Sequence, residues 1–113
     1  MTREQYIENN QDKFLNELFD LLKIPSISAD SDYALDVQRC AEYTAMRLKE
    51  AGADNVTLEQ TSGNPIVYGD KIIDPNKPTI LVYGHYDVQP VSYTHLRAHE
   101  TRHDLVCRLL LEK

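Results

Sequence analysis

The feature that most constrains this chain is a short apolar run that ends in a histidine and an aspartate. Residues 80–83 are Ile-Leu-Val-Tyr, Gly84 follows, and His85 and Asp87 come next with one residue between them. The run predicts a buried strand, and open α/β sheets hold ligands and metals at the carboxyl ends of their strands. Because residues i and i+2 of an extended segment point the same way, His85 and Asp87 can serve one site. The pattern predicts a metal-binding imidazole beside the carboxylate that fixes its tautomer and orientation.

Two amphipathic helices are predicted ahead of this run. Residues 2–5 have the spacing of a capping box, and the helix that follows ends at Pro25, since proline disfavours a helical residue before it. A loop rich in turn formers then leads to a second helix over about 33–51, with Gly52 as its C-terminal stop. The residues predicted to face inward on the second helix are Val37, Cys40, Ala41, Thr44 and Leu48.

Beyond Gly52 the apolar period changes from that of a helix to that of a strand. Val56 and Leu58 alternate with polar residues, which predicts a half-buried strand, and residues 64–69 predict a second one. The continuous apolar run over 80–83 predicts a third strand, central in a sheet and covered on both faces. Two helices followed by about three strands predict the opening segment of an α/β domain.

The residues around the His-x-Asp motif carry a resemblance to a known family. Residues 78–90 are Pro-Thr-Ile-Leu-Val-Tyr-Gly-His-Tyr-Asp-Val-Gln-Pro. This stretch closely resembles the first metal-ligand motif of the dinuclear zinc aminoacylase, dipeptidase and carboxypeptidase family, and its second half is similar to the carnosinase and dipeptidase branch. The resemblance extends in order over residues 12–90. It implies that His85 is a zinc ligand and that Asp87 is the catalytic-site carboxylate that helps to position it.

The resemblance implies an activity for a parent protein rather than for this chain. Such a parent is a metal-dependent hydrolase with a two-zinc site, and it cleaves the amide bond of a small peptide or an acyl-amino acid. In the family a bridging aspartate, a Glu-Glu pair and further ligands lie downstream of the first motif, and none of them occurs in residues 1–90. The expectation is a truncated catalytic domain that is itself inactive, from a parent for which a homodimer is one option.

Residues 91–113 have a different origin in this interpretation. They begin Val-Ser-Tyr-Thr-His-Leu-Arg-Ala-His-Glu-Thr and end Asp-Leu-Val-Cys-Arg-Leu-Leu-Leu-Glu-Lys. Both stretches resemble the conceptual translation of a transposase-type sequencing-library adapter, and a variable index between them keeps the reading frame. The predicted organisation is therefore an N-terminal fragment of a zinc-hydrolase catalytic domain over 1–90, followed by a non-native, adapter-derived tail over 91–113.

The tail also contains a pattern that would otherwise indicate a metalloprotease. His99, Glu100 and His103 fit the His-Glu-x-x-His pattern, in which two histidines one helical turn apart bind zinc and the glutamate is the base. His103 falls within the adapter index, so the adapter resemblance argues against this zincin-like function. It is kept as one alternative. The other is a non-catalytic α/β binding module in which His85 and Asp87 are only part of a strand-end turn.

Neighbouring polar residues receive structural interpretations. Ser26 and Ser28 have no Gly-x-Ser-x-Gly surroundings, so loop and capping roles are predicted rather than nucleophilic ones. Tyr83 and Tyr86, which flank His85, are predicted to be packing residues.

The composition restricts partners and compartment. A net charge of -6 argues against nucleic acid or an anionic membrane as partner. Cys40 and Cys107 are the two cysteines and Cys107 lies in the tail, so no disulfide framework is implied, which fits a reducing compartment. No segment reaches the roughly 20 apolar residues that span a membrane, and the N-terminus predicts a polar helix instead of a signal region. A cytoplasmic location is therefore expected.

Overall fold

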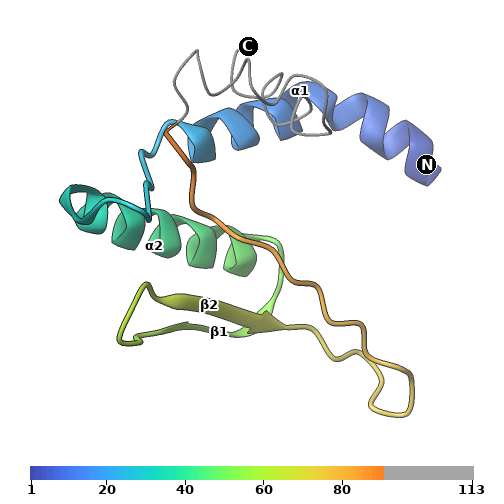
Figure 1. Ribbon diagram of the computed structural model, residues 1–113. Coiled ribbons are helices and arrows are strands. Elements are labelled where there is room, and N and C mark those ends of the chain that lie inside the picture. Colours follow the sequence, from blue (N-terminus) through green and yellow to red (C-terminus); the bar gives the residue numbers. More distant parts are fainter. Residues whose placement is uncertain (91–113) are drawn as a thin grey trace, which may run out of the picture.

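The computed structural model describes residues 1–90, which form two helices and a β-hairpin (Figure 1). Helix α2 packs on the hairpin, and α1 approaches α2 from the other side. The segment that precedes residue 90 crosses α2 and reaches the loop between the helices. This confirms an α/β segment. In chain order the elements are α1 (Arg3–Leu22), the 3-10 turn η1 (Ser31–Tyr33), α2 (Ala34–Glu50), β1 (Asp54–Glu59) and β2 (Ile66–Asp70).

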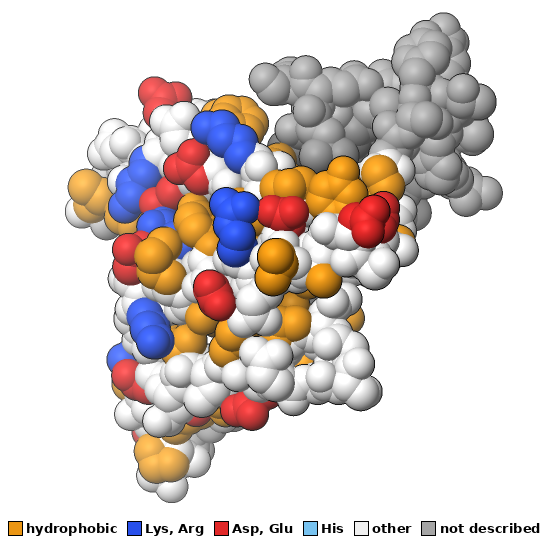
Figure 2. Space-filling model, turned by 90° about the vertical axis from the view of Figure 1, so that its left-hand side faces the viewer, with side chains coloured by type: hydrophobic (Ala, Val, Ile, Leu, Met, Phe, Trp, Pro, Cys, Tyr) orange, Lys and Arg blue, Asp and Glu red, His pale blue; other side chains and the backbone are white. Residues whose placement is uncertain are grey.

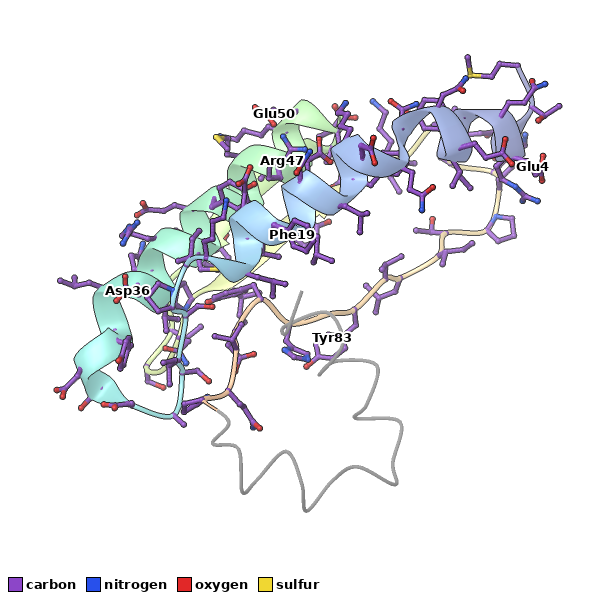
Figure 3. The ribbon with its side chains drawn as sticks, turned by 90° about the horizontal axis from the view of Figure 1, so that it is seen from above. Glu4, Phe19, Asp36, Arg47, Glu50 and Tyr83 are labelled. Carbon is purple, nitrogen blue, oxygen red and sulfur yellow. The ribbon has the colours of Figure 1, made fainter. Side chains whose placement is uncertain are left out.

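The first helix begins as predicted but buries little. The Thr2 hydroxyl accepts a hydrogen bond from the Gln5 amide at 3.2 Å, and the Gln5 side chain accepts one from the Thr2 amide at 3.0 Å, so the capping box is confirmed. No residue of α1 is buried. One contact with α2 is an ion pair between Glu17 and Arg47, the latter labelled in Figure 3, with an Nη2–Oε1 distance of 2.5 Å. Neither described helix combines the length and apolarity needed to cross a bilayer.

The second helix supplies the core of the described part of the chain. Val37, Cys40 and Ala41 are buried on one face, as the sequence predicts. At the C-terminal end, Gly52 has a left-handed φ of +92°, a conformation that costs an L side chain strain. Its amide donates to the Lys49 carbonyl, and the Ala53 amide donates to the Leu48 carbonyl, which is the Schellman geometry. The predicted stop at Gly52 is confirmed.

The hairpin confirms the first two predicted strands. β1 and β2 pair antiparallel, with Leu58 opposite Val67, and both side chains are half-buried. Gly69 lies at the contact between β2 and its neighbours: a Cβ there would come within 3.3 Å of Val56 Cγ2, which is tight, and within 3.5 Å of Leu48 Cδ1 of α2, which is an ordinary contact.

The predicted third strand over 80–83 is wrong for the described part of the chain. These residues pair with no other strand, and their four side chains are 85–90% exposed. A strand is stabilised by ladder hydrogen bonds to its neighbours, and this run pairs with neither β1 nor β2, the two strands of the described sheet. The expectation that Tyr83 is a packing residue is wrong for the same reason. Apolar side chains also reach the surface elsewhere, among charged ones (Figure 2).

Candidate metal-ligand site

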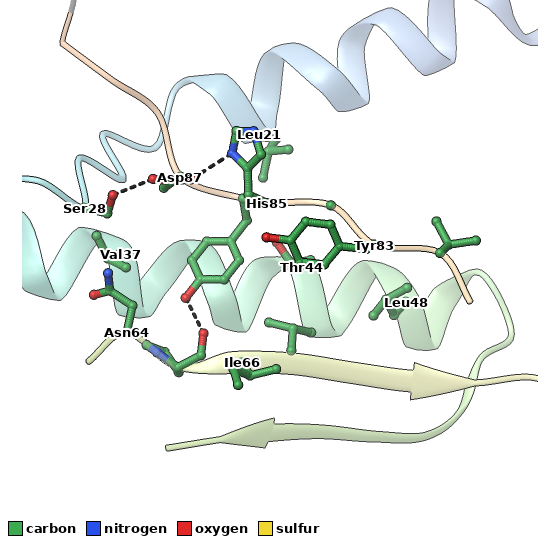
Figure 4. Close-up of a pocket in the computed structure, with 15 residues that line it drawn as sticks. Leu21, Ser28, Val37, Thr44, Leu48, Asn64, Ile66, Tyr83, His85 and Asp87 are labelled. Carbon is green, nitrogen blue, oxygen red and sulfur yellow. Dashed lines mark hydrogen bonds and ion pairs between the residues drawn. The ribbon is translucent and has the colours of Figure 1, made fainter. Parts of the chain in front are cut away.

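The structure places His85 and Asp87 in contact at the end of the extended segment (Figure 4). His85 Nδ1 lies 2.8 Å from Asp87 Oδ1. The imidazole is 78% exposed and the carboxylate 32% exposed. The two side chains that the sequence assigned to one site are therefore adjacent, and the imidazole is open to a ligand.

Asp87 also accepts a hydrogen bond from the hydroxyl of Ser28, through its other oxygen, Oδ2. This bond is the main reason that the pKa of Asp87 lies below its usual value; the His85 bond and charge add to the effect, and burial opposes it. Asp87 is thus ionised at neutral pH and can only accept hydrogen bonds. In the neutral imidazole, His85 Nδ1 must then carry the hydrogen, and the Nε2 lone pair is free for a metal.

The backbone of the motif is fastened to the loop between the helices. The Val88 amide donates to the Ser26 carbonyl at 3.0 Å, and Ile27 forms a parallel bridge with Val88. The Tyr86 carbonyl accepts from Ser26 Oγ at 3.0 Å and from Cys40 Sγ at 3.3 Å. Two buried side chains therefore hold the peptide that lies between the histidine and the aspartate.

Tyr86 ties the motif to the hairpin as well. Its hydroxyl donates to the Pro65 carbonyl at 2.6 Å, just before β2 begins. The side chain is half-buried, so the predicted packing role is confirmed for this tyrosine, with a hydrogen bond added.

Ser26 and Ser28 are site residues that the sequence interpretation missed. Both were assigned loop and capping roles, yet each bonds to the His-x-Asp segment. The sequence carries no local signal for these bonds, because Ser26 and Ser28 lie 60 and 59 residues from the residues that they contact.

A cavity of about 540 Å³ lies beside the motif. Its volume is within the range of small-molecule sites. His85 and Asp87 are among its lining residues, and the imidazole points toward α1 rather than toward α2 and β2 (Figure 4). The α2 and β2 side chains in its lining are Val37, Thr44, Leu48, Ile66 and Val67.

Cys40 gives a prediction about the packing beneath the motif. Burial raises the pKa of its thiol, so the associated stability is fully present below about pH 8.5 and is lost as the pH rises above it. We expect an alkaline fall in stability that Cys40→Ala reduces. We also expect alkylation of Cys40, followed by peptide mass mapping, to be slow in buffer and fast in urea. Equal alkylation rates in the two solvents would contradict the burial.

The described residues supply one metal ligand at this site, not a complete set. Within residues 1–90 no three side chains from His, Cys, Asp and Glu are grouped so that they could hold an ion. A catalytic zinc site uses three protein ligands and an open position. His85 Nε2 is available as one of them. His99, Glu100 and His103, together with the rest of the predicted adapter tail, lie outside the described residues.

Comparisons with known proteins point to metallodipeptidases, although no protein-family model matches the chain. The Cys-Gly metallodipeptidase dug1 of Schizosaccharomyces pombe is 33% identical over 97 residues, and DUG1 of Candida albicans is 35% identical over 96. The Beta-Ala-His dipeptidase of Rattus norvegicus is 34% identical over 100 residues. These alignments cover 74–78% of this chain and 20% of each relative.

A solved structure shows the same similarity in three dimensions. It is that of the dipeptidase Dug1p from Saccharomyces cerevisiae, which matches 77% of this chain with a TM-score of 0.70 and 28% sequence identity. The match takes in 20% of the Dug1p chain, so this chain spans about a fifth of the length of its relatives. The chain is therefore related to metallodipeptidases of the Dug1 and carnosinase kind, and its partial match is consistent with an N-terminal fragment of that family.

Proposed function

We propose that this chain is part of a metal-dependent hydrolase that cleaves the amide bond of a dipeptide or an acyl-amino acid. His85 would be a zinc ligand, and Asp87 the carboxylate that positions it. The observation that carries the proposal is the 2.8 Å contact between His85 Nδ1 and Asp87 Oδ1, which leaves Nε2 open. Support for the substrate class comes from the relatives, which are named as Cys-Gly and Beta-Ala-His dipeptidases.

The division of labour at such a site follows from these two side chains. Zinc, two ions in the intact site, would polarise the scissile carbonyl and activate a water. His85 would bind through Nε2 while its Nδ1 hydrogen stays on Asp87. The negative charge of Asp87 makes the imidazole a better donor to the metal and keeps its ring from turning. The general base and the remaining ligands would come from the parent protein beyond residue 90.

We further propose that the 113-residue chain itself is inactive. Within residues 1–90, one imidazole with its carboxylate is fewer than the three protein ligands of a catalytic zinc site. For the parent we propose a cytoplasmic enzyme, supported by the unpaired, buried thiol of Cys40, with no nucleic-acid or membrane partner. A homodimer is the oligomeric state to test.

Hydrolysis assays separate these proposals. We expect no zinc-dependent cleavage of Cys-Gly or β-Ala-His by the purified 113-residue chain, and clear cleavage by the protein encoded at the uninterrupted locus. Hydrolysis by the short chain would contradict its inactivity, and a parent without metal-dependent hydrolysis would contradict the function.

The same assay distinguishes the alternatives. Activity of the short chain that is lost in His99→Ala and Glu100→Ala but kept in His85→Ala would indicate the zincin-like function. A parent that neither binds zinc nor is stabilised by it would indicate a binding module.

A further inference from the structure

We infer that Ser28 is a positioning residue of the metal-ligand motif. Its hydroxyl holds the Asp87 carboxylate in the orientation that keeps the hydrogen of His85 on Nδ1 and the lone pair on Nε2. The importance of this for metal binding rests on the proposed function. The positioning itself is a property of the three side chains and needs no metal.

The argument begins with the two oxygens of Asp87. Oδ1 contacts His85 Nδ1 at 2.8 Å, and Oδ2 accepts the hydrogen of Ser28 Oγ (Figure 4). The terminal torsion of an aspartate is broad, so one hydrogen bond alone leaves the carboxylate free to rotate. With a partner on each oxygen, any rotation that abandons His85 also breaks the bond to Ser28. The carboxylate is a third exposed, and without Ser28 its second oxygen would turn to water.

The backbone places Ser28 where it can act. The bridge between Ile27 and Val88 sets the two segments side by side in parallel, and the Val88 amide donates to the Ser26 carbonyl. Buried Ser26 meets the Tyr86 carbonyl, and Ser28, in the turn that begins after Ile27, meets the Asp87 carboxylate. The position of Ser28 is thus fixed by contacts that do not involve its own hydroxyl.

A purely structural role for Ser28 makes a different prediction. A hydroxyl that only fastens the loop would, when removed, loosen the loop and leave the imidazole as it was. A positioning hydroxyl would, when removed, leave the fold and change the tautomer of His85. The imidazole tautomer is therefore the decisive quantity. Which ring nitrogen carries the hydrogen depends on the hydrogen bonds that the ring makes, here the bond between Nδ1 and Asp87.

The experiment uses the full 113-residue chain, labelled with ¹⁵N, and long-range proton–nitrogen correlation of the imidazole. His95→Gln, His99→Gln and His103→Gln form the background, so that His85 is the one histidine observed. Spectra are taken at about pH 8, where an ordinary histidine is neutral. In this background the Nδ1–H tautomer should dominate.

Three variants at serine positions test the inference. In Ser28→Ala the ratio of Nδ1–H to Nε2–H should fall about three- to tenfold, the size expected for the loss of one ordinary hydrogen bond. Ser28→Thr keeps the hydroxyl and should keep the ratio. Ser62→Ala, in the exposed turn between β1 and β2, is the matched control and should also keep it.

An unchanged ratio in Ser28→Ala, with a backbone amide spectrum that shows an intact fold, would overturn the inference. If Ser28→Ala unfolds, Ser28→Cys gives the second test. A thiol fills the same space but donates hydrogen bonds weakly, so we expect a tautomer ratio lower than that of the serine chain. An unchanged ratio in Ser28→Cys would contradict the inference. A dominant Nε2–H tautomer in the background chain, in which Ser28 is unchanged, would also overturn the inference.

This outcome is independent of the proposed function. The readout uses neither metal nor substrate, so an unchanged tautomer removes the role of Ser28 and leaves the hydrolase proposal standing. A parent without metal-dependent hydrolysis removes the proposed function and leaves the tautomer result standing.

Discussion

Replacing Val37 with aspartate should unfold the chain. Val37 is 1% exposed and belongs to the small set of buried apolar residues that α2 supplies. An unpaired carboxylate at such a position costs about 3–5 kcal/mol. Small domains have total stabilities that begin near 5 kcal/mol, so most or all of the stability of this chain would be lost. Far-UV circular dichroism and urea titration measure the effect.

The neighbouring residue Leu35 offers a matched control. It lies in the first turn of the same helix and is 80% exposed. Leu35→Asp introduces the same group without burying it, and negative charge near a helix N-terminus is favourable. We expect its free energy of unfolding to stay within about 0.5 kcal/mol of that of the unsubstituted chain. A Val37→Asp chain that keeps the urea midpoint of Leu35→Asp would show that the α2 face is not the core.

The second large effect concerns catalysis in the intact parent. His85→Ala should lower kcat/KM by more than the roughly 10- to 100-fold typical of losing a ligand's hydrogen-bonding partner, because it removes the ligand itself. Asp87→Asn keeps the histidine ligand, so its loss of kcat/KM should lie within the roughly 10- to 100-fold range. The zinc content of the purified variants should decrease in the same order.

A surface substitution distinguishes a site effect from general damage. Lys71 is exposed and pairs with Asp54 at 3.2 Å, in the part of the hairpin where β2 ends. Lys71→Ala should keep both kcat/KM and zinc content. A His85→Ala parent with the zinc content and activity of Lys71→Ala would contradict the assignment of His85.

Local chemistry made much of this fold predictable. The capping box at residues 2–5 and the left-handed Gly52 depend on residues close in sequence. The alternation of Val56 and Leu58 similarly indicated a half-buried strand, because one face of the hairpin rests on α2. In each case the contacts that decide the conformation lie within residues 1–90.

The failures have a common physical cause. The run over 80–83 has the composition of a central strand, but a strand needs paired neighbours, and within the described residues the run pairs with neither β1 nor β2. Phe14 and Leu15 of α1 likewise show an apolar face and remain partly exposed. The apolar pattern of a segment indicates that it can pack against another apolar surface. Whether it does so depends on a packing partner from another part of the protein.

The site was predictable in its first contact and not in its second. His85 and Asp87 are two residues apart, so the extended backbone alone allows their side chains to meet. Ser28 is 59 residues from Asp87, and their hydrogen bond depends on the parallel approach of two segments that no local rule specifies. The partner of the carboxylate therefore became visible only in the structure.

The genomic sequence across codon 90, amplified from unprocessed DNA, tests the central proposal most directly. We expect the frame to continue past Pro90 into several hundred residues that include a bridging aspartate and a Glu-Glu pair. Genomic DNA that encodes Val91 to Lys113 would contradict both the adapter-derived tail and the truncated hydrolase. His99, Glu100 and His103 would then be the candidate metal site of this chain.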